Sequence, residues 1–360
     1  MRAHRTTCAG ICARRFDATR SAGACRRGPA LVALVLAALG AATAPAQEPE
    51  AQGAAQAAFA ELEASAGRRT SGSFPFDFQH LAFFPNGPDG VELWTAASVH
   101  AGRVRGVFEG GWVYRLAMRV ELTRDGEVVA SDETRIRHAL NVLIPPHSTD
   151  GFPIQTRVVV PPGRYDYRIE LQDLNWEGDR SVNAMTGTVT VPPFESGRPF
   201  LSSIAVAADS GGAWRPAPEV TLKLNAAKMV QTDARPFVYF EVYGLTPGGT
   251  FRGDVRLVST WVSRGKGETF DGVWQPFTLQ YRASAPEEEG VPVRAVLRLD
   301  MQDTRPGPYE VRVRVTDVAT GLSSDVRKAG VFVRAPEDRG AVQPIEEVGQ
   351  DRGDGGGGER

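Results

Sequence analysis

The acidic turn Asp173-Leu174-Asn175-Trp176-Glu177-Gly178 comes nearest to a chemical motif in this sequence. Oxygen-bearing side chains stand at alternate positions and glycine stands sixth, as in the opening of a calcium-binding loop. The carboxylate that closes such a loop would fall at Ala184, which has no ligand atom. A β-turn is the preferred interpretation, because Asp, Asn and Gly favour turns on their own. We predict no metal and no cofactor, and keep Asp173, Asn175 and Glu177 as candidate ligand-binding residues.

Two tryptophans offer a different chemistry, the stacking of an aromatic ring on a sugar or a peptide. Trp176 lies in the acidic turn and Trp214 lies in a second polar segment, so both are predicted to be in loops. Glycan binding through Trp176 and Trp214 is one hypothesis, and packing over the edge of a β-sheet is the alternative. Trp94, Trp112 and Trp261 fall in alternating segments and are predicted core residues.

No catalytic motif is present, and we assign no catalytic residue. The histidines that follow residue 46 lack the spacing of a zinc protease, and no serine-hydrolase or phosphate-loop motif occurs; they are His80, His100, His138 and His147. Cys8, Cys12 and Cys25 all precede residue 46, so disulfides and cysteine nucleophiles are excluded from the rest of the chain. A hydrolase site assembled in a cleft between domains is kept as a hypothesis.

The first 46 residues are predicted to be a secretory signal peptide. Arg26 and Arg27 precede an apolar run over residues 29–42, and Ala44-Pro45-Ala46 is a small-x-small cleavage site. The run is shorter than the ~20 residues that span a bilayer, so we expect no transmembrane anchor after cleavage. A periplasmic or secreted protein is the expected result.

Charge bears on the class of partner. The presequence carries seven Arg and one Asp, so its removal leaves a mildly acidic chain. Nucleic acid requires clustered positive charge, and we therefore predict that it is not a partner.

Both ends of the remaining chain have compositions that bury little apolar surface. Residues 47–73 are rich in Ala, Gln, Glu and Gly, although Phe59, Leu62 and Ala66 stand at helical spacing. A flexible spacer is preferred there to a partner-docking helix. Residues 336–360 form an acidic, glycine-rich tail that is predicted to be disordered.

Between these ends the chain contains one strand motif twice. PPGRYDYRIELQDL occupies residues 161–174, and RPGPYEVRVRVTDV occupies residues 305–318. In each copy a Pro-Gly turn begins a two-residue alternation, which is typical of a strand with one buried and one wet face. The tyrosines that follow the two turns, Tyr165 and Tyr309, are expected at a sheet corner. Each copy is followed by a returning strand, so the same hairpin should close two related domains.

The short alternating segments predict an all-β protein of two tandem antiparallel β-sandwiches, of the immunoglobulin or fibronectin kind. The first is placed at residues 74–193, the proline-rich linker at 194–199 and the second at 200–335. Strands are expected near residues 92–99, 104–109, 112–122, 128–136, 154–160, 165–174, 186–191, 201–207, 220–224, 237–243, 254–262, 277–282, 293–299, 309–317 and 330–333.

The order of these segments resembles a known family. The quoted stretches are VELW near Val91, GGWVYRLAMRVEL, DGEVVASD, PPGRYDYRIELQDLN, LSSIAVA and FVYFEVYGL. Together they resemble the β-sandwich portion of bacterial GWxTD-domain-containing proteins over most of residues 90–335. Gly111-Trp112 is followed by Val113-Tyr114-Arg115, so the Gly-Trp-x-Thr-Asp motif itself is absent. The resemblance implies export and a sandwich fold, and it transfers no functional residue.

The leading functional hypothesis is an exported, non-enzymatic protein that binds another envelope or extracellular protein or acts as an envelope scaffold. A glycan-binding module that uses Trp176 and Trp214 is the first alternative. A hydrolase with its site in the inter-domain cleft is the second alternative.

Overall fold

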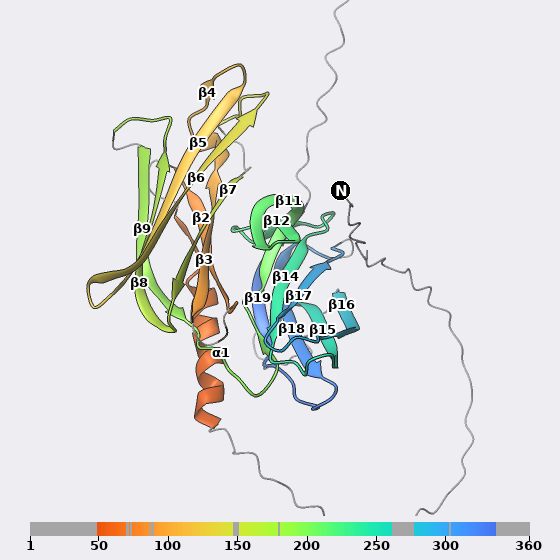
Figure 1. The fold of residues 1–360 in the computed structure, drawn as a ribbon. Helices are drawn as coiled ribbons and strands as arrows, with labels where there is room; N and C mark the ends of the chain where they lie inside the picture. Colours follow the sequence, from red (N-terminus) through yellow and green to blue (C-terminus); the bar gives the residue numbers. More distant parts are fainter. Residues whose placement is uncertain are drawn as a thin grey trace, which may run out of the picture. The chain divides into compact units, whose positions relative to one another are not determined.

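The computed structural model describes residues 49–69, 72, 74–85, 87, 90–146, 151–178, 181–260, 277–301 and 304–335. In this part of the chain a helix precedes strands that form four sheets (Figure 1). The predicted fold class, all-β with two antiparallel sandwiches, is confirmed. The predicted signal peptide, the predicted tail, His147 and Trp261 lie outside the described residues.

The first sandwich is built from two sheets. One has the order β1-β2-β3-β7 and consists of β1 (Gly67–Arg69), β2 (Phe76–Phe83), β3 (Val91–His100) and β7 (Gly151–Val160). The other has the order β4-β5-β8-β9, with β6 also paired to β5; its strands are β4 (Val107–Phe108), β5 (Trp112–Arg124), β6 (Glu127–Leu140), β8 (Gly163–Asp173) and β9 (Val182–Val191). All of these pairings are antiparallel.

The second sandwich also has two sheets. One has the order β10-β14-β11-β12, with β17 also paired to β14; its strands are β10 (Phe200–Leu201), β11 (Ala205–Ala217), β12 (Val220–Leu224), β14 (Phe237–Tyr243) and β17 (Val293–Arg298). The other has the order β13-β19-β18-β15-β16 and consists of β13 (Met229–Gln231), β15 (Thr250–Ser259), β16 (Phe277–Ser284), β18 (Gly307–Asp317) and β19 (Arg327–Arg334). The short pair β13–β19 is parallel.

The repeated motif forms the same strand in both sandwiches. β8 lies between β5 and β9, and β18 lies between β15 and β19, so each copy is followed by the expected closing hairpin. The Tyr165 hydroxyl donates to the Pro161 carbonyl at 2.7 Å, and the Tyr309 hydroxyl donates to the Arg305 carbonyl at 2.8 Å. Both tyrosines are therefore corner residues, as predicted.

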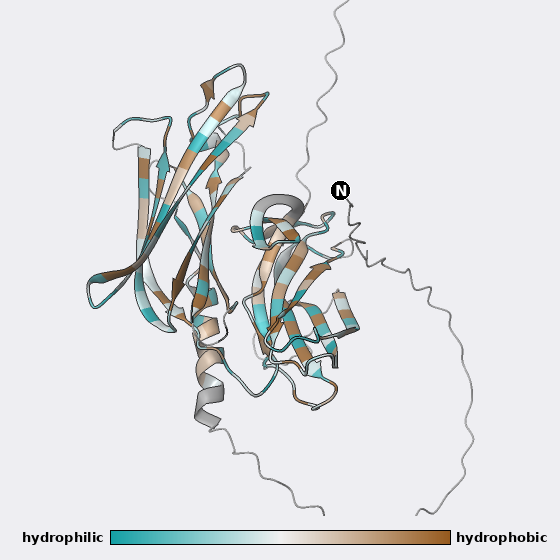
Figure 2. Cartoon of the chain, viewed as in Figure 1, coloured by the Kyte–Doolittle hydropathy of each residue, from teal (hydrophilic) through white to brown (hydrophobic). Residues whose placement is uncertain are grey.

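The hydrophobic residues form three buried clusters. One fills the first sandwich and another fills the second, because the inward-facing positions of their strands alternate with polar ones. The same alternation is visible as brown and teal bands along the strands in Figure 2. The third cluster joins residues of β2 and β3, including Leu81 and Phe83, to β11, β12 and β14, including Ala205 and Tyr239. The two sandwiches therefore share one apolar contact and belong to one compact unit.

Polar contacts reinforce this shared surface. The Ala82 amide donates to the Ser203 hydroxyl at 2.9 Å, and the Ser203 amide returns a bond to the Ala82 carbonyl at 3.0 Å. The Phe84 amide donates to the Tyr243 hydroxyl at 2.9 Å. Because each bond satisfies a buried backbone group of one sandwich with an atom of the other, breaking them would leave unpaired groups on both sides.

Helix α1 (Pro49–Ala64) corrects the prediction of a flexible spacer at residues 47–73. Ala55, Phe59 and Leu62 are buried on one side of the helix. Amino-acid composition does not predict this helix, because only two large side chains supply most of its apolar contact. Its small alanines favour the helix and let it approach the strands closely. Among the described residues, no helix is long and apolar enough to cross a membrane.

Candidate functional site

The predicted acidic turn lies at the end of the first sandwich where β8 stops and β5 begins. The pairing of Leu116 with Asp173 places the turn beside the start of β5. The pairings of Trp112 with Leu140 and with Phe108 bring the end of β6 and the strand β4 to the same end. Three connections therefore meet there: residues 101–111, the segment that follows β6, and the turn after β8.

Asp173 is a structural residue of this end. One carboxylate oxygen accepts the Arg105 amide at 2.7 Å, and the other accepts the Asn175 amide at 3.0 Å. The side chain is buried, and burial raises the pKa of its carboxyl group above the ordinary value although both backbone bonds oppose the shift. The prediction of Asp173 as a ligand-binding residue is wrong, because its oxygens are turned inward and already accept hydrogen bonds.

Asn175 ties the same connections together. Its amide nitrogen donates to the carbonyls of Arg105 and Val113, both at 2.8 Å, and its oxygen accepts a bond from Arg115 at 3.1 Å. Arg115 also makes two bonds of 2.7 and 2.6 Å to the Glu109 carboxylate, and these bonds lower the pKa of Glu109. Both polar atoms of Asn175 bond to the protein, so the side chain serves as a tether, and its role as a ligand-binding residue stays a prediction.

Trp176 and Glu177 are the predicted residues that face solvent. Trp176 is 38% exposed, and the Arg105 guanidinium carbon lies 4.9 Å from the centre of its ring. Glu177 is exposed as well. Because Arg105 occupies one face of the indole, a ligand has the opposite face and the ring edge to bind.

Trp214 is not in a loop, and its proposed role as a surface platform is wrong. It lies on β11, is 1% exposed, and packs against Trp94, Phe83 and Tyr239 with ring centres 6.0, 5.9 and 5.3 Å away. The polar, glycine-containing sequence before it is typical of a loop. In the structure this segment belongs to β11, which pairs with β12 through several shifts of register. Trp214 therefore belongs to the contact between the sandwiches.

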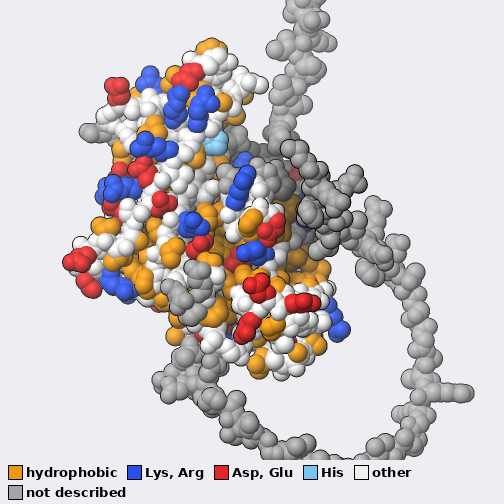
Figure 3. Space-filling view, viewed as in Figure 1, with side chains coloured by type: hydrophobic (Ala, Val, Ile, Leu, Met, Phe, Trp, Pro, Cys, Tyr) orange, Lys and Arg blue, Asp and Glu red, His pale blue; other side chains and the backbone are white. Residues whose placement is uncertain are grey.

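Other exposed apolar residues lie in the three connections that meet at this end, and sequence patterns did not identify them. The exposed fractions are 66% for Phe108, 69% for Val142, 50% for Leu143 and 36% for Leu174. We call Phe108, Val142, Leu143, Leu174 and Trp176 the loop-end patch. Figure 3 shows Lys, Arg and hydrophobic side chains intermingled at this end of the sandwich. Contiguous exposed apolar side chains rimmed by charge are typical of interaction sites.

The described histidines have separate structural roles. His80 is buried, and burial lowers its pKa to about 3; His100 lies 3.5 Å from Asp77; and His138 stacks on Phe152 at 4.7 Å, with burial lowering its pKa. Among the described residues, no group of three or more His, Cys, Asp or Glu side chains is placed to hold a metal ion.

The hydrolase hypothesis requires a nucleophile beside a base, and Ser203 and His80 both line a cavity beside α1. The Ser203 hydroxyl accepts the Ala82 amide, and the Nδ1 atom of His80 bonds to the Thr95 hydroxyl at 2.9 Å. A nucleophile must be hydrogen-bonded to its base, but the Nε2 atom of His80 has no hydrogen-bond partner among the described residues and therefore accepts no bond from Ser203. The geometry of this pair therefore does not favour hydrolysis.

Comparison with known proteins gives little further information. No protein-family model matches the chain, and no curated protein matches it. Among solved structures, Escherichia coli α2-macroglobulin activated by porcine elastase shares 12% identity over 73% of this chain and 24% of that chain, with a TM-score of 0.23. Red sea bream transglutaminase shares 8% identity over 74% of this chain and 32% of that chain, with a TM-score of 0.21. At these scores the likeness carries no argument about function.

Proposed function

We propose that this chain is an exported, non-enzymatic binding protein whose first sandwich presents the loop-end patch to another protein of the cell envelope or the extracellular space. The observation that carries the proposal is the exposure of five apolar side chains at one end of the first sandwich. They come from three connections. Phe108 and Trp176 provide aromatic anchors of the kind that dominate protein interfaces. Export and the relation to GWxTD-domain-containing proteins remain predictions from the sequence.

The internal hydrogen bonds of this end favour a binding role. Asp173, Asn175 and Arg115 hold the connections by bonds of 2.7 to 3.1 Å, so the patch is presented on a preorganised framework. Preorganisation reduces the loss of conformational entropy when a partner binds. The aliphatic residues Val142, Leu143 and Leu174 favour a protein partner over a glycan, because sugar hydroxyls require hydrogen-bonding side chains.

A capture experiment with paired variants tests the proposal. The immobilised chain would be exposed to envelope fractions of the source organism, beside Phe108→Ser/Val142→Ser/Leu143→Ser and the control Val128→Ser/Val129→Ser. The control residues are also exposed, at 59% and 48%, but lie at the opposite end of β5 and β6. We expect a protein that is retained by the wild type and the control and lost by the patch variant. Retention of the same proteins by all three would contradict the proposal.

Glycan binding remains the second candidate, now resting on Trp176 because Trp214 is buried. Stacking on the open face of the indole would change its fluorescence. Titration with cell-wall and plant polysaccharides, in the wild type and in Trp176→Leu, checks this candidate. A flat response from the wild type would eliminate it.

A further inference from the structure

A cavity of about 360 Å³ lies beside α1, and no residue of the loop-end patch lines it. Its lining includes Phe59 and Leu62 of α1, His80 of β2, Ile204 between β10 and β11, and Arg327 of β19. Cavities of this size that combine apolar walls with a few polar groups are typical of small-molecule sites.

Arg327 is the unusual residue of this cavity. It is 5% exposed, and its Nη2 atom donates to the Leu201 carbonyl at 3.0 Å. Its Nε and Nη1 atoms have no hydrogen-bond partner among the described residues. The guanidinium carbon lies 3.2 Å from the centre of the Phe59 ring, so the helix covers one face of the cation.

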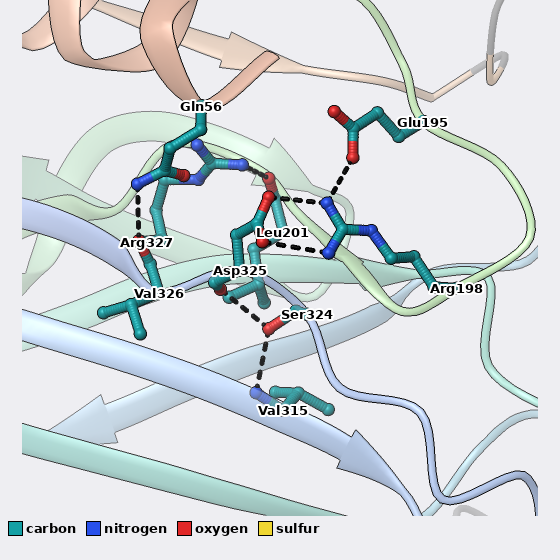
Figure 4. A network of polar contacts seen from close by, with 9 residues as sticks. All are labelled: Gln56, Glu195, Arg198, Leu201, Val315, Ser324, Asp325, Val326 and Arg327. Carbon is teal, nitrogen blue, oxygen red and sulfur yellow. Dashed lines mark hydrogen bonds and ion pairs between the residues drawn. The ribbon is translucent and has the colours of Figure 1, made fainter. Parts of the chain in front are cut away.

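The nearby carboxylates do not satisfy Arg327. Asp325 accepts two bonds from Arg198, at 2.9 and 2.6 Å, and Glu195 accepts another from Arg198 at 2.6 Å (Figure 4). Burial lowers the pKa of Arg327 to about 9, which still leaves the group charged at neutral pH. A buried cation without a hydrogen-bonded anion is unfavourable, and a bound anion would correct this.

His80 supplies a second unsatisfied group. Its Nε2 atom has no partner among the described residues, while its Nδ1 atom bonds to Thr95. The ring is enclosed by Tyr167 and Phe78, with centres 4.9 and 5.8 Å away. Because its pKa is lowered to about 3, the imidazole is neutral and can donate or accept one hydrogen bond.

The remaining walls define the ligand. Phe59, Leu62 and Ile204 are apolar, whereas Glu63, Glu310 and Lys328 bring charges of both signs to the same lining. Glu63 accepts bonds from Lys228 and from the Gly330 amide, and Glu310 pairs with Arg312. Both carboxylates are thus paired with cations, whereas Arg327 has no hydrogen-bonded anion, so the lining offers one uncompensated positive charge to a ligand with one negative charge.

We propose that this cavity binds a small monoanionic carboxylate with an apolar body. The carboxylate pairs with the guanidinium of Arg327, whose buried Nε and Nη1 atoms lack a partner among the described residues, and the apolar part lies against Phe59, Leu62 and Ile204. This site is independent of the loop-end patch, and neither proposal depends on the other.

Isothermal titration of the full mature chain tests the proposal, with octanoate and 3-phenylpropionate as carboxylates, octanamide as the uncharged analogue and inorganic phosphate as a bare anion. We expect at least one carboxylate to bind, octanamide to bind about tenfold or more weakly, and phosphate to give no heat. Equal affinity for octanoate and octanamide, or no binding of either carboxylate, would overturn the proposal.

Variants locate the ligand. Arg327→Met keeps an apolar stem and removes the charge, and it should reduce carboxylate affinity about tenfold or more. Ala60 is an exposed helix residue that lines the cavity, so Ala60→Phe should block binding without affecting the fold. Ala57→Phe, at an exposed position of the same helix outside the lining, is the matched control. Unchanged carboxylate affinity in Ala60→Phe would rule out this cavity, even if Arg327→Met failed to fold.

Discussion

Asp317 makes the same pair of backbone hydrogen bonds in the second sandwich that Asp173 makes in the first. One oxygen accepts the amide two residues later, from Asn175 at 3.0 Å or from Ala319 at 2.8 Å. The other accepts an amide that precedes the neighbouring strand, from Arg105 at 2.7 Å or from Thr246 at 2.8 Å. The repeated Asp is therefore part of the fold, and Trp176 is what distinguishes the first copy of the turn.

Asp317→Asn should destabilise the protein at neutral pH. The amide and the hydroxyl of Thr246 both donate to the same carboxylate oxygen of Asp317. An NH₂ group in place of this oxygen could accept neither bond. Losing hydrogen bonds to a buried charge costs about 1–3 kcal/mol. Urea unfolding would measure this loss, and an unchanged midpoint would contradict the structural role.

The two aspartates should respond to acid in opposite directions. Burial alone would raise the pKa of Asp317, but its hydrogen bonds outweigh burial and hold the pKa below the ordinary value of 3.8. Its contribution to stability is present above 3.8 and is lost as pH falls through the lower folded pKa. The pKa of Asp173 is raised, so its contribution is present below 3.8 and declines as pH rises through the folded pKa.

Urea unfolding at about pH 7 and about pH 3 compares the two variants. The difference in unfolding free energy between the wild type and Asp317→Asn should shrink on acidification. The difference between the wild type and Asp173→Asn should not shrink. The same pH dependence in both variants would show that their carboxylates have equivalent surroundings.

Removing the corner hydroxyls should cost stability in both sandwiches. Tyr165→Phe and Tyr309→Phe each lose one bond to a carbonyl, worth about 0.5–1.5 kcal/mol. Tyr281→Phe is a matched control, because the Tyr281 hydroxyl has no partner among the described residues and burial raises its pKa to about 12. The control should be neutral or stabilising in denaturant unfolding, and a loss equal to that of the corner variants would count against this account.

Helix α1 should contribute to the stability of the whole unit. Phe59→Ala and Leu62→Ala each leave a cavity in the first core, with an expected loss of about 2–5 kcal/mol. Ala57→Ser, at an exposed position of the same helix, should change stability by less than about 0.5 kcal/mol. Thermal unfolding checks these values, and equal melting temperatures for all of the variants would mean that the helix is not docked.

Fluorescence quenching distinguishes the two predicted binding tryptophans. Trp176 is exposed and Trp214 is buried, so acrylamide should reach the first more readily than the second. Trp176→Phe should remove quenchable, red-shifted emission, and Trp214→Phe should remove blue-shifted emission that resists quenching. Greater protection of Trp176 than of Trp214 would contradict the assignment.

The strands that could be predicted are those with one wet face. In β8 and β18 the alternation and the Pro-Gly turn follow from the sequence alone, and both corner tyrosines are confirmed. β2 was missed because its sequence, FDFQHLAF, does not alternate: every residue in it is buried. Burial on both faces removes the period on which strand prediction depends.

The candidate sites were only partly predictable. Trp176 stands out in a turn, but the exposure of Phe108, Val142 and Leu143 depends on which connections meet in space. The cavity is harder still: Arg327 is in phase with the inward-facing Ala329, Val331 and Val333 of β19, but an arginine at the start of a strand is not expected to be buried. Only the docking of α1 and β10 against β19 makes it a buried cation.

β2 has no side that belongs to solvent: Phe76, Phe78 and Ala82 complete the first core, whereas Leu81 and Phe83 complete the contact with the second sandwich. Two copies of one strand motif are often a sign of two independent domains. Here the copies have become mutually dependent. Separating the sandwiches would expose aromatic and aliphatic side chains on both of them, so neither is expected to be stable without the other.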